Sequence, residues 1–432
     1  MNFAVDPIVI GCFVLFVVLM LLRMPIPFAM FTCSIIYGIF YGESFAMFAQ
    51  KISKSFSDWS MLAVPAFLFV GSVMNEVGLS TRIFAMFDRW IGHWPGGLAH
   101  ANVMASMVFA GMSGSALADA GGLGTIEVRA MQDAGYEDGF CVAVTAASST
   151  IGPIIPPSIN LIMWGYLSSV STTALFMGGL IPGILMGISM MILIVIMVKT
   201  EKISAPRSKK GTWKERFISV YKAIPALMGP AILMGGIMGG VFTPTECGVV
   251  AAAYCVFLGI AYRKVNFATI RSVLRNTVSS CAVVMGLTAT GLVFNWMIVT
   301  SGLIDALTNM LLALNSEILV LLVLNIAMLV LGCFIGSMQI MLMMSPLLLT
   351  ISSALGFDLV HIGVVVVFNL VIGLITPPFA PALFMTCKAT NVDFKKALPL
   401  TVQFLIPLIL VLILITYFPT LVLWLPKTMG IW

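Results

Sequence analysis

The stretch SSTIGPIIPPS, residues 148–158, interrupts an apolar segment that extends from about residue 139 to residue 168. A second stretch, GLITPPFAP at residues 373–381, interrupts the apolar segment 361–386 in the same way. Proline removes a backbone donor and clashes with the preceding turn, which costs about 3 kcal/mol inside a helix. Both segments are therefore predicted to be broken helices, with backbone carbonyls freed at each break.

The two breaks occur in register within a duplicated chain. A shift of 221 residues, with no gap, superposes three pairs of glycines and both double prolines. The superposed residues are Gly111 on Gly332, Gly135 on Gly356, Gly152 on Gly373, and Pro156-Pro157 on Pro377-Pro378. Self-similarity at a fixed offset indicates an internal repeat. We expect a first repeat at 1–198, a basic loop at 199–222 and a second repeat at 223–432.

The composition places most of the chain in lipid. Of its residues 60% are hydrophobic and 9% are charged, whereas a soluble domain carries about 25% charged residues. A helix that spans a membrane needs about 20 mostly apolar residues. The segments predicted to span are 6–22, 25–42, 61–77, 139–168, 172–198, 225–241, 246–262, 277–300, 361–386 and 397–424. The fold class expected is an all-α polytopic membrane protein.

The first span is not predicted to be a signal peptide. No basic region precedes it, and Arg23-Met24-Pro25 follows it where a small-residue cleavage site would stand.

The basic loop predicts the topology. It contains eight basic residues, namely Lys199, Lys202, Arg207, Lys209, Lys210, Lys214, Arg216 and Lys222. Short loops rich in Lys and Arg remain in the cytoplasm, which favours membrane insertion over nucleic-acid binding for this loop. Five spans precede it, so the amino terminus is predicted to lie outside. Each repeat then has an odd number of spans, and the second repeat would be inverted relative to the first.

Two stretches rich in glycine and serine lie midway along apolar segments. They are GMSGSALADAGG at 111–122 and GCFIGSMQ at 332–339. Each is predicted to be the tip of a re-entrant hairpin, the first at about 98–135 and the second at about 316–355. Small residues allow the tip to approach the broken helix of the same repeat. Transporters with inverted repeats place their sites at such discontinuous helices, and the freed oxygens suit a small cation.

Other residues are assigned roles within this scheme. The stretch 80–95 is amphipathic and is predicted to be an arm helix at the membrane interface, with 303–316 as its counterpart. Asp119 is ionisable within an apolar segment, so it is a candidate substrate contact or a group that orders the tip. Ser148, Ser149 and Asn160, at the first break, are further candidate substrate contacts. The alternative for Asn160 is a hydrogen bond between helices. The eight cysteines are scattered singly, which argues against a disulfide or metal framework.

At these motifs the chain resembles the large membrane subunit of the tripartite ATP-independent periplasmic (TRAP) transporters. The matching stretches are 111–116, 152–158, 240–246 and 373–378. The resemblance implies a small four-helix membrane subunit and a periplasmic substrate-binding protein as partners. It also implies uptake of an organic acid, such as a sialic acid or a C4-dicarboxylate, across the bacterial inner membrane. Uptake would be driven by Na⁺ through an elevator motion, with no cofactor other than the coupling ion.

The resemblance also implies two Na⁺ sites. The first would use Ser113 and Ser115 with backbone oxygens near Gly152, Ile155 and Pro157. The second set is larger and comprises Gly336 or Ser337, Gly373, Thr376 and Phe379, with Thr243 and Thr245.

Three alternatives remain open. A carrier of the same broad ion-transporter class could act alone on carboxylates. A scaffold without transport is also conceivable, although it would have no need of paired helix breaks. An intramembrane serine protease is the third, because residues 111–114 read Gly-Met-Ser-Gly. Such an enzyme needs a general base beside the serine, and the histidines are His93, His100 and His361. No phosphate-binding GxxxxGK[ST] motif occurs, so transport is not expected to use ATP. A transporter subunit rather than an enzyme is expected.

Overall fold

The computed structural model describes residues 7–200, 203, 205–208 and 210–431, with the side chains of 110–113 excepted. All regular secondary structure in this part of the chain is helical. Seven of its helical segments are long and apolar enough to cross a membrane, the longest being α14 with 34 residues. The chain is therefore an all-α polytopic membrane protein.

The first half of the chain forms eleven α-helices and one 3₁₀ helix. They are α1 (Pro7–Leu21), α2 (Ile26–Phe40), α3 (Phe45–Phe56), η1 (Trp59–Leu62), α4 (Ala63–Val77), α5 (Leu79–Ile91), α6 (Gly97–Ser113), α7 (Ala116–Gly121), α8 (Leu123–Asp133), α9 (Asp138–Ser149), α10 (Ile159–Ser168) and α11 (Thr172–Lys199).

The second half follows the same order. Its helices are α12 (Trp213–Met238), α13 (Pro244–Ala261), α14 (Phe267–Thr300), α15 (Leu303–Leu312), α16 (Glu317–Gly332), α17 (Ser337–Leu355), α18 (Leu359–Gly373), α19 (Pro381–Thr390), α20 (Phe394–Tyr417) and α21 (Thr420–Thr428). The main difference is that α14 is one continuous helix where the first half has α3, η1 and α4. Both Pro156-Pro157 and Pro377-Pro378 contain cis peptide bonds.

Helix caps recur at corresponding positions of the two halves. Ser44 caps α3 by accepting from the Ala46 N–H, and Asn266 caps α14 by accepting from the Thr269 N–H. Gly78 and Gly302, with φ of 75° and 71°, turn the chain from α4 into α5 and from α14 into α15. These left-handed positions favour glycine, which has no Cβ to clash. Polar N-cap residues and left-handed glycines therefore mark the boundaries of equivalent helices in both halves.

The basic loop is shorter than expected. The Thr212 hydroxyl accepts from the Glu215 N–H, and the Glu215 carboxylate accepts from the Thr212 N–H, so a capping box begins α12 at Trp213. Such a box satisfies two backbone donors of the first helical turn. Residues 213–222, predicted as loop, are therefore helical. The arms are also shorter than predicted: α5 replaces 80–95 and α15 replaces 303–316.

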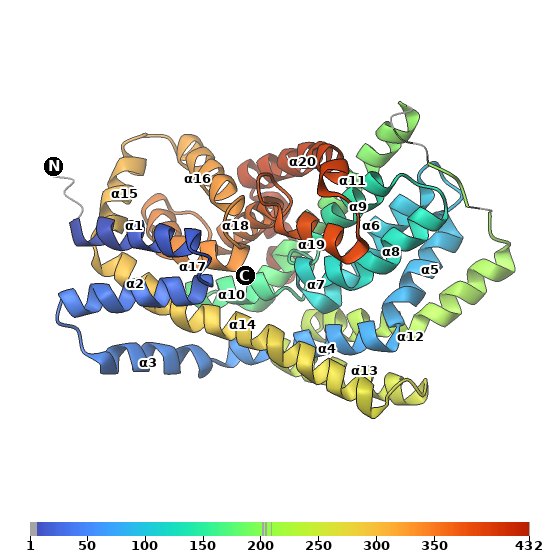
Figure 1. Ribbon diagram of the computed structural model, residues 1–432, viewed down its shortest axis with the longest axis horizontal. Helices are drawn as coiled ribbons and strands as arrows, with labels where there is room; N and C mark the ends of the chain where they lie inside the picture. Colours follow the sequence, from blue (N-terminus) through green and yellow to red (C-terminus); the bar gives the residue numbers. More distant parts are fainter. Residues whose placement is uncertain (1–6, 201–202, 204, 209, 432) are drawn as a thin grey trace.

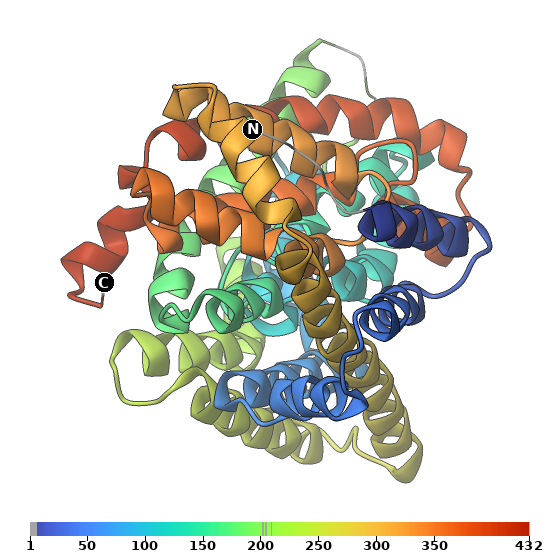
Figure 2. The same ribbon diagram turned by 90° about the vertical axis from the view of Figure 1, so that its left-hand side faces the viewer.

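The helices α2, α4, α13 and α14 form a layer along one edge of the molecule (Figure 1). α14 packs along α2, α3 and α4, and α13 packs on α4 and α12. Figure 1 shows α5 and α15 at opposite ends of the long axis of the molecule, although they occupy equivalent positions in the two halves. Figure 2, viewed from the end near α15, shows the long α14 running along one side of α2 and α3.

Two glycine backbones touch where α16 meets α18. A Cβ built on Gly373 would lie 2.8 Å from the Gly332 Cα, and one built on Gly332 would lie 3.1 Å from the Gly373 Cα. Backbone atoms cannot move aside as a flexible side chain can, so no side chain fits between these helices.

We expect Gly373→Ala to destabilise the protein by roughly 1–3 kcal/mol, the usual cost of overpacking. Gly286→Ala is the matched control, because a Cβ there meets nothing within 4 Å and alanine favours a helix. Thermal unfolding in detergent would measure both variants. Equal stability of the two variants would contradict close packing at Gly373.

Candidate functional site

A cavity of about 550 Å³ lies between the two glycine-rich tips. Its walls include residues 114–118 of the first tip and 336–339 of the second tip. Pro153, Ile159 and Asn160 from the first break and Leu374 from the second break also line it. The remaining wall comes mainly from α14, between Ser279 and Leu287. The cavity thus unites the features that the sequence singled out in both repeats.

Three helices begin at the wall of this cavity. Ser115 precedes α7 and accepts from the Ala118 N–H at 3.5 Å, and α17 begins at Ser337. Ser158 caps α10 by accepting from the Leu161 N–H at 3.1 Å. Helix N-termini carry partial positive charge and unpaired N–H groups, which suits an anion.

The described lining contains no ionisable side chain. Its polar side chains are Ser115, Asn160, Ser279, Ser280, Ser337 and Gln339. An anion held here would therefore be balanced by helix dipoles and by any cation that enters with it. A buried charge without such balance is costly.

The first tip meets the first break through backbone atoms. Gly114 has a φ of 57°, and a Cβ on it would lie 2.9 Å from the Pro157 carbonyl oxygen. A Cβ on Gly152 would lie 2.6 Å from Asp119 Oδ2, so this carboxylate rests against the break. Of the first predicted Na⁺ set, Ser115, Gly152 and Pro157 therefore belong to one tip–break junction. The side chain of Ser113 lies outside the described residues.

Ile155, the remaining member of the first set, is buried and its side chain points toward Gly183 of α11. Only its backbone could therefore serve a site on the tip side of the break.

The second tip meets the second break in two places. Gly332 touches Gly373, and the rings of Phe334 and Phe379 pack edge to face with centroids 5.7 Å apart. Thr376, between these contacts in sequence, donates its hydroxyl to the Ile372 carbonyl at 2.8 Å. Gly336 and Ser337 lie at the start of α17 beside this junction.

Thr243 and Thr245, predicted for the second site, lie elsewhere. Thr243 and Glu246 form the capping box of α13, and the Thr245 hydroxyl donates to the Trp59 carbonyl at 3.2 Å. α13 packs mainly on α4, α12 and η1. The motif GVFTPTE therefore begins α13 in the edge layer, and Thr243 serves there as the helix cap.

Asp119, Ser148, Ser149 and Asn160 have different environments. Asn160 lines the cavity and donates to the Ser337 hydroxyl at 3.2 Å, which joins the two repeats. Asp119 is buried against Gly152. Ser148 donates to Asn102 Oδ1 at 2.7 Å, and Ser149 donates to the Ala146 carbonyl at 2.8 Å. Both serines are buried on α9 and are absent from the cavity wall, which makes them structural groups in this conformation.

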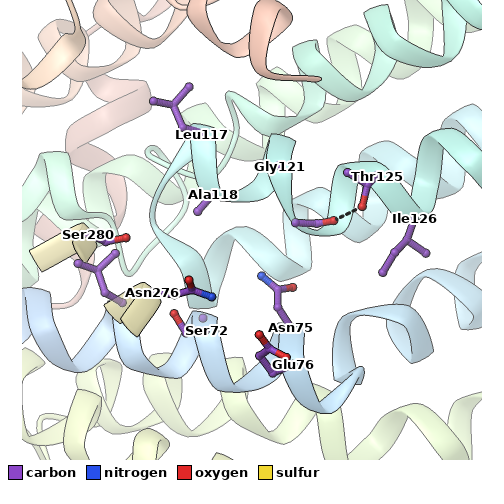
Figure 3. Close-up of a pocket in the computed structure, with 13 residues that line it drawn as sticks. Ser72, Asn75, Glu76, Leu117, Ala118, Gly121, Thr125, Ile126, Asn276 and Ser280 are labelled. Carbon is purple, nitrogen blue, oxygen red and sulfur yellow. Dashed lines mark hydrogen bonds between the residues drawn. The ribbon is translucent and has the colours of Figure 1, made fainter. Parts of the chain in front are cut away.

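A second cavity, of about 500 Å³, adjoins the first and was missed by the sequence prediction. The two share Leu68, Leu117, Ala118 and Ser280. Figure 3 shows Ser72, Asn75 and Glu76 of α4 facing α7, with Asn276 of α14 beside them. Its polar residues are spread over three helices with no common motif, so only their positions in space reveal them.

The structure brings no histidine to the first tip. His100 is on the same helix as Ser113 but 13 residues earlier, about 20 Å at the helical rise. His361 Nε2 lies 2.8 Å from the Ile415 carbonyl, and His93 Nδ1 lies 3.5 Å from an Arg216 nitrogen. This geometry does not support the serine protease alternative.

A family model and two related proteins match nearly the whole chain. The family model described as the DctM component of tripartite ATP-independent periplasmic transporters matches residues 13–421. The sialic acid TRAP transporter large permease protein SiaM of Vibrio cholerae is 38% identical over 94% of this chain and 95% of its own length. The sialic acid TRAP transporter permease protein SiaT of Haemophilus influenzae is 34% identical over 95% of this chain and 67% of its own length.

Among solved structures, the YdaH transporter of Alcanivorax borkumensis has a similar fold. The TM-score is 0.56 at 15% identity, over 87% of this chain and 88% of that one. At this identity the likeness concerns the fold alone.

The bond between Asn160 and Ser337 can be tested by a double-mutant cycle. We expect Asn160→Ala and Ser337→Ala to show a coupling free energy of about 0.5–1.5 kcal/mol in unfolding, the usual net value of a hydrogen bond. Asn160→Ala combined with Ser279→Ala is the control, since both residues line the cavity. Additive effects in the first pair would contradict a bond between the repeats.

Proposed function

The chain belongs to the family of large membrane permeases of the tripartite ATP-independent periplasmic transporters, and we propose that it takes up an organic acid together with Na⁺ by an elevator motion. Members of this family normally work with a small membrane subunit and a periplasmic binding protein. The proposal for this chain includes both partners and the bacterial inner membrane.

The cavity between the two tips is the observation that carries this proposal. It has the helix N-termini that an anion needs and no cationic side chain in its described lining. The N-termini of α10 and α17, helices of 10 and 19 residues, carry partial positive charge that can stabilise a carboxylate. A coupling cation at the adjacent tip–break junctions would complete the balance of charge, so anion and cation would bind together.

We assign the two Na⁺ sites to these junctions. The first comprises Ser113, Ser115 and backbone oxygens at Gly152, Ile155 and Pro157. The second comprises Gly336, Ser337, Gly373, Thr376 and Phe379; Thr243 and Thr245 do not belong to it. Hydroxyl and carbonyl oxygens are the ligands that hard cations prefer, and irregular backbone at such depth needs a polar partner.

The packing of the helices supports a division into a moving part and a fixed part. α10, after the first break, packs on α17, while α19, after the second break, packs on α7 and α8. The two tips and breaks thus pack on each other, and in this proposal they move as one body against α14, which also packs on α17. The layer of α2, α4, α13 and α14 would be the scaffold. The units α6–α8 and α16–α17 would be re-entrant hairpins, and α5 and α15 would be the arms that link the parts.

The chemistry of the cavity and two of the relatives support a proposal for the substrate class. The cavity volume of about 550 Å³ is within the usual range for small-molecule sites. Its hydroxyl and amide groups suit a polyhydroxylated acid, and the two relatives described above are named for sialic acid. We therefore propose a sialic acid as the substrate, with a C4-dicarboxylate as the alternative.

The energetics allow accumulation without ATP. One positive charge that moves inward across 100 mV releases about 2.3 kcal/mol, and tenfold accumulation costs about 1.4 kcal/mol. Two Na⁺ with one monovalent anion carry net positive charge inward, so the membrane potential and the Na⁺ gradient act together.

Reconstitution with the candidate small subunit and binding protein tests the function. We expect uptake of labelled sialate into proteoliposomes only with an inward Na⁺ gradient. Equal uptake with K⁺ on both sides would overturn Na⁺ coupling. Equal uptake without the binding protein would favour the carrier that acts alone, and labelled succinate in place of sialate tests the substrate class.

Single hydroxyls at the junctions should govern the response to Na⁺. We expect Ser115→Ala and Thr376→Ala each to raise the Na⁺ concentration for half-maximal uptake roughly tenfold, about 1.4 kcal/mol, because each removes one ligand. Thr350→Ala is the matched control for Thr376, since its hydroxyl makes the same bond to the fourth preceding carbonyl, at 2.9 Å. Unchanged Na⁺ titration of both variants would remove these residues from the sites.

A further inference from the structure

A third cavity, of about 300 Å³, lies between the short helix α5 and the start of α12. Arg82 and Arg89 line it from α5, and Glu215 and Lys222 line it from α12. The apolar side chains Ala85, Met86 and Ile218 and the hydroxyl of Ser219 complete the wall. It is separate from the proposed transport site, whose lining shares no residue with it.

The charges around this cavity are unbalanced. Three cationic side chains face one carboxylate, and that carboxylate is already engaged: Glu215 Oε2 accepts from the Thr212 N–H at 2.8 Å. Arg82 lies over the ring of Tyr262, 4.0 Å from the ring centre. Arg89 and Lys222 are exposed on opposite walls. Guanidinium and ammonium groups arranged in this way suit a phosphate oxygen.

Aromatic side chains place the cavity at the depth of lipid headgroups. Trp213, Phe217 and Tyr221 are 67%, 63% and 77% exposed and follow one another at every fourth residue of α12. They therefore share one face of the helix. Aromatic residues of this kind collect at the membrane–water interface. Trp213 is held in place because it stacks with Phe217, their ring centres 6.2 Å apart.

The same end of the molecule carries further positive charge. α12 and α13 are joined by a short turn and pack together, so the end of α13 returns to the side where α12 begins. Arg263 and Lys264 follow α13 there, and Arg207, Lys210, Lys214 and Arg216 precede or begin α12. An excess of Lys and Arg marks the cytoplasmic side, whose leaflet contains anionic lipids.

We propose that this cavity binds the phosphate of an anionic phospholipid headgroup from the cytoplasmic leaflet. Arg89 and Lys222 contact the phosphate from the two walls, and the acyl chains run past Met86 and Ile218, which are apolar side chains of the same cavity. The lipid thereby bridges α5 to α12. Because α5 connects α4 to the helix that leads to the first tip, a bound lipid holds this connection against the neighbouring span.

Native mass spectrometry of the full chain in detergent can test this site, with dioleoylphosphatidylglycerol and dioleoylphosphatidylcholine as probes. We expect the wild type to bind dioleoylphosphatidylglycerol more tightly than dioleoylphosphatidylcholine. In Arg89→Gln/Lys222→Gln its dissociation constant should rise roughly thirtyfold, from about fivefold per removed charge. Arg82 is left intact because its packing on Tyr262 supports the fold.

Lys264→Gln/Arg271→Gln is the control, since it removes two exposed charges from the same end but outside the cavity. Equal loss of binding in this variant would overturn the proposal in favour of a general surface attraction. Full displacement of the lipid by an equimolar amount of inorganic phosphate would also overturn it, because a free anion would then be the ligand. Equal affinity of the wild type for both lipids would exclude a headgroup site.

Discussion

The contact between each glycine-rich tip and the neighbouring helix break is the constraint on which the rest of the structure depends. Gly114 lies against the Pro157 carbonyl, and Gly332 lies against Gly373, with no side chain between the backbones. Proline breaks the helices and glycine allows the backbones to approach each other, so both residue types are needed for the contact between tip and break. α10, which leaves the first break, and the tip helices α7 and α17 start at the common cavity, and an N-terminal helix end favours an anion.

The two halves depend on each other as well as resembling each other. Asn160, after the first break, bonds to Ser337 at the second tip, and α19, after the second break, packs on α7 at the first tip. Each half thus completes the junction of the other. A substrate bound between the tips would contact both halves at once, which is what coupling between an anion and two cation sites requires.

Buried hydrogen bonds join the helices that lead to the two breaks to their neighbours. Asn102, Thr145 and Ser148 join α6 to α9, and Asn325, Asn369 and Thr416 join α16, α18 and α20. Buried hydrogen bonds of this kind hold helices in one relative rotation, and only the Oδ1 atom of Asn369 lacks a partner among these six side chains. The positions of Ser148 and Asn369 differ by the repeat offset of 221 residues, so the two networks occupy equivalent places although their side chains differ.

The sequence by itself determined the membrane class, the duplication and the two helix breaks. Composition, a fixed offset, and the local effects of proline and glycine carry this information without reference to distant residues. Tertiary structure decided which polar groups face the cavity, because the rotation of each helix about its axis is set by packing. Asn160 therefore lines the cavity while Ser148 and Ser149 are buried between helices, and Thr243 caps α13. The cavity beside Asn75 and the basic cavity between α5 and α12 likewise arise only when segments far apart in the chain pack side by side.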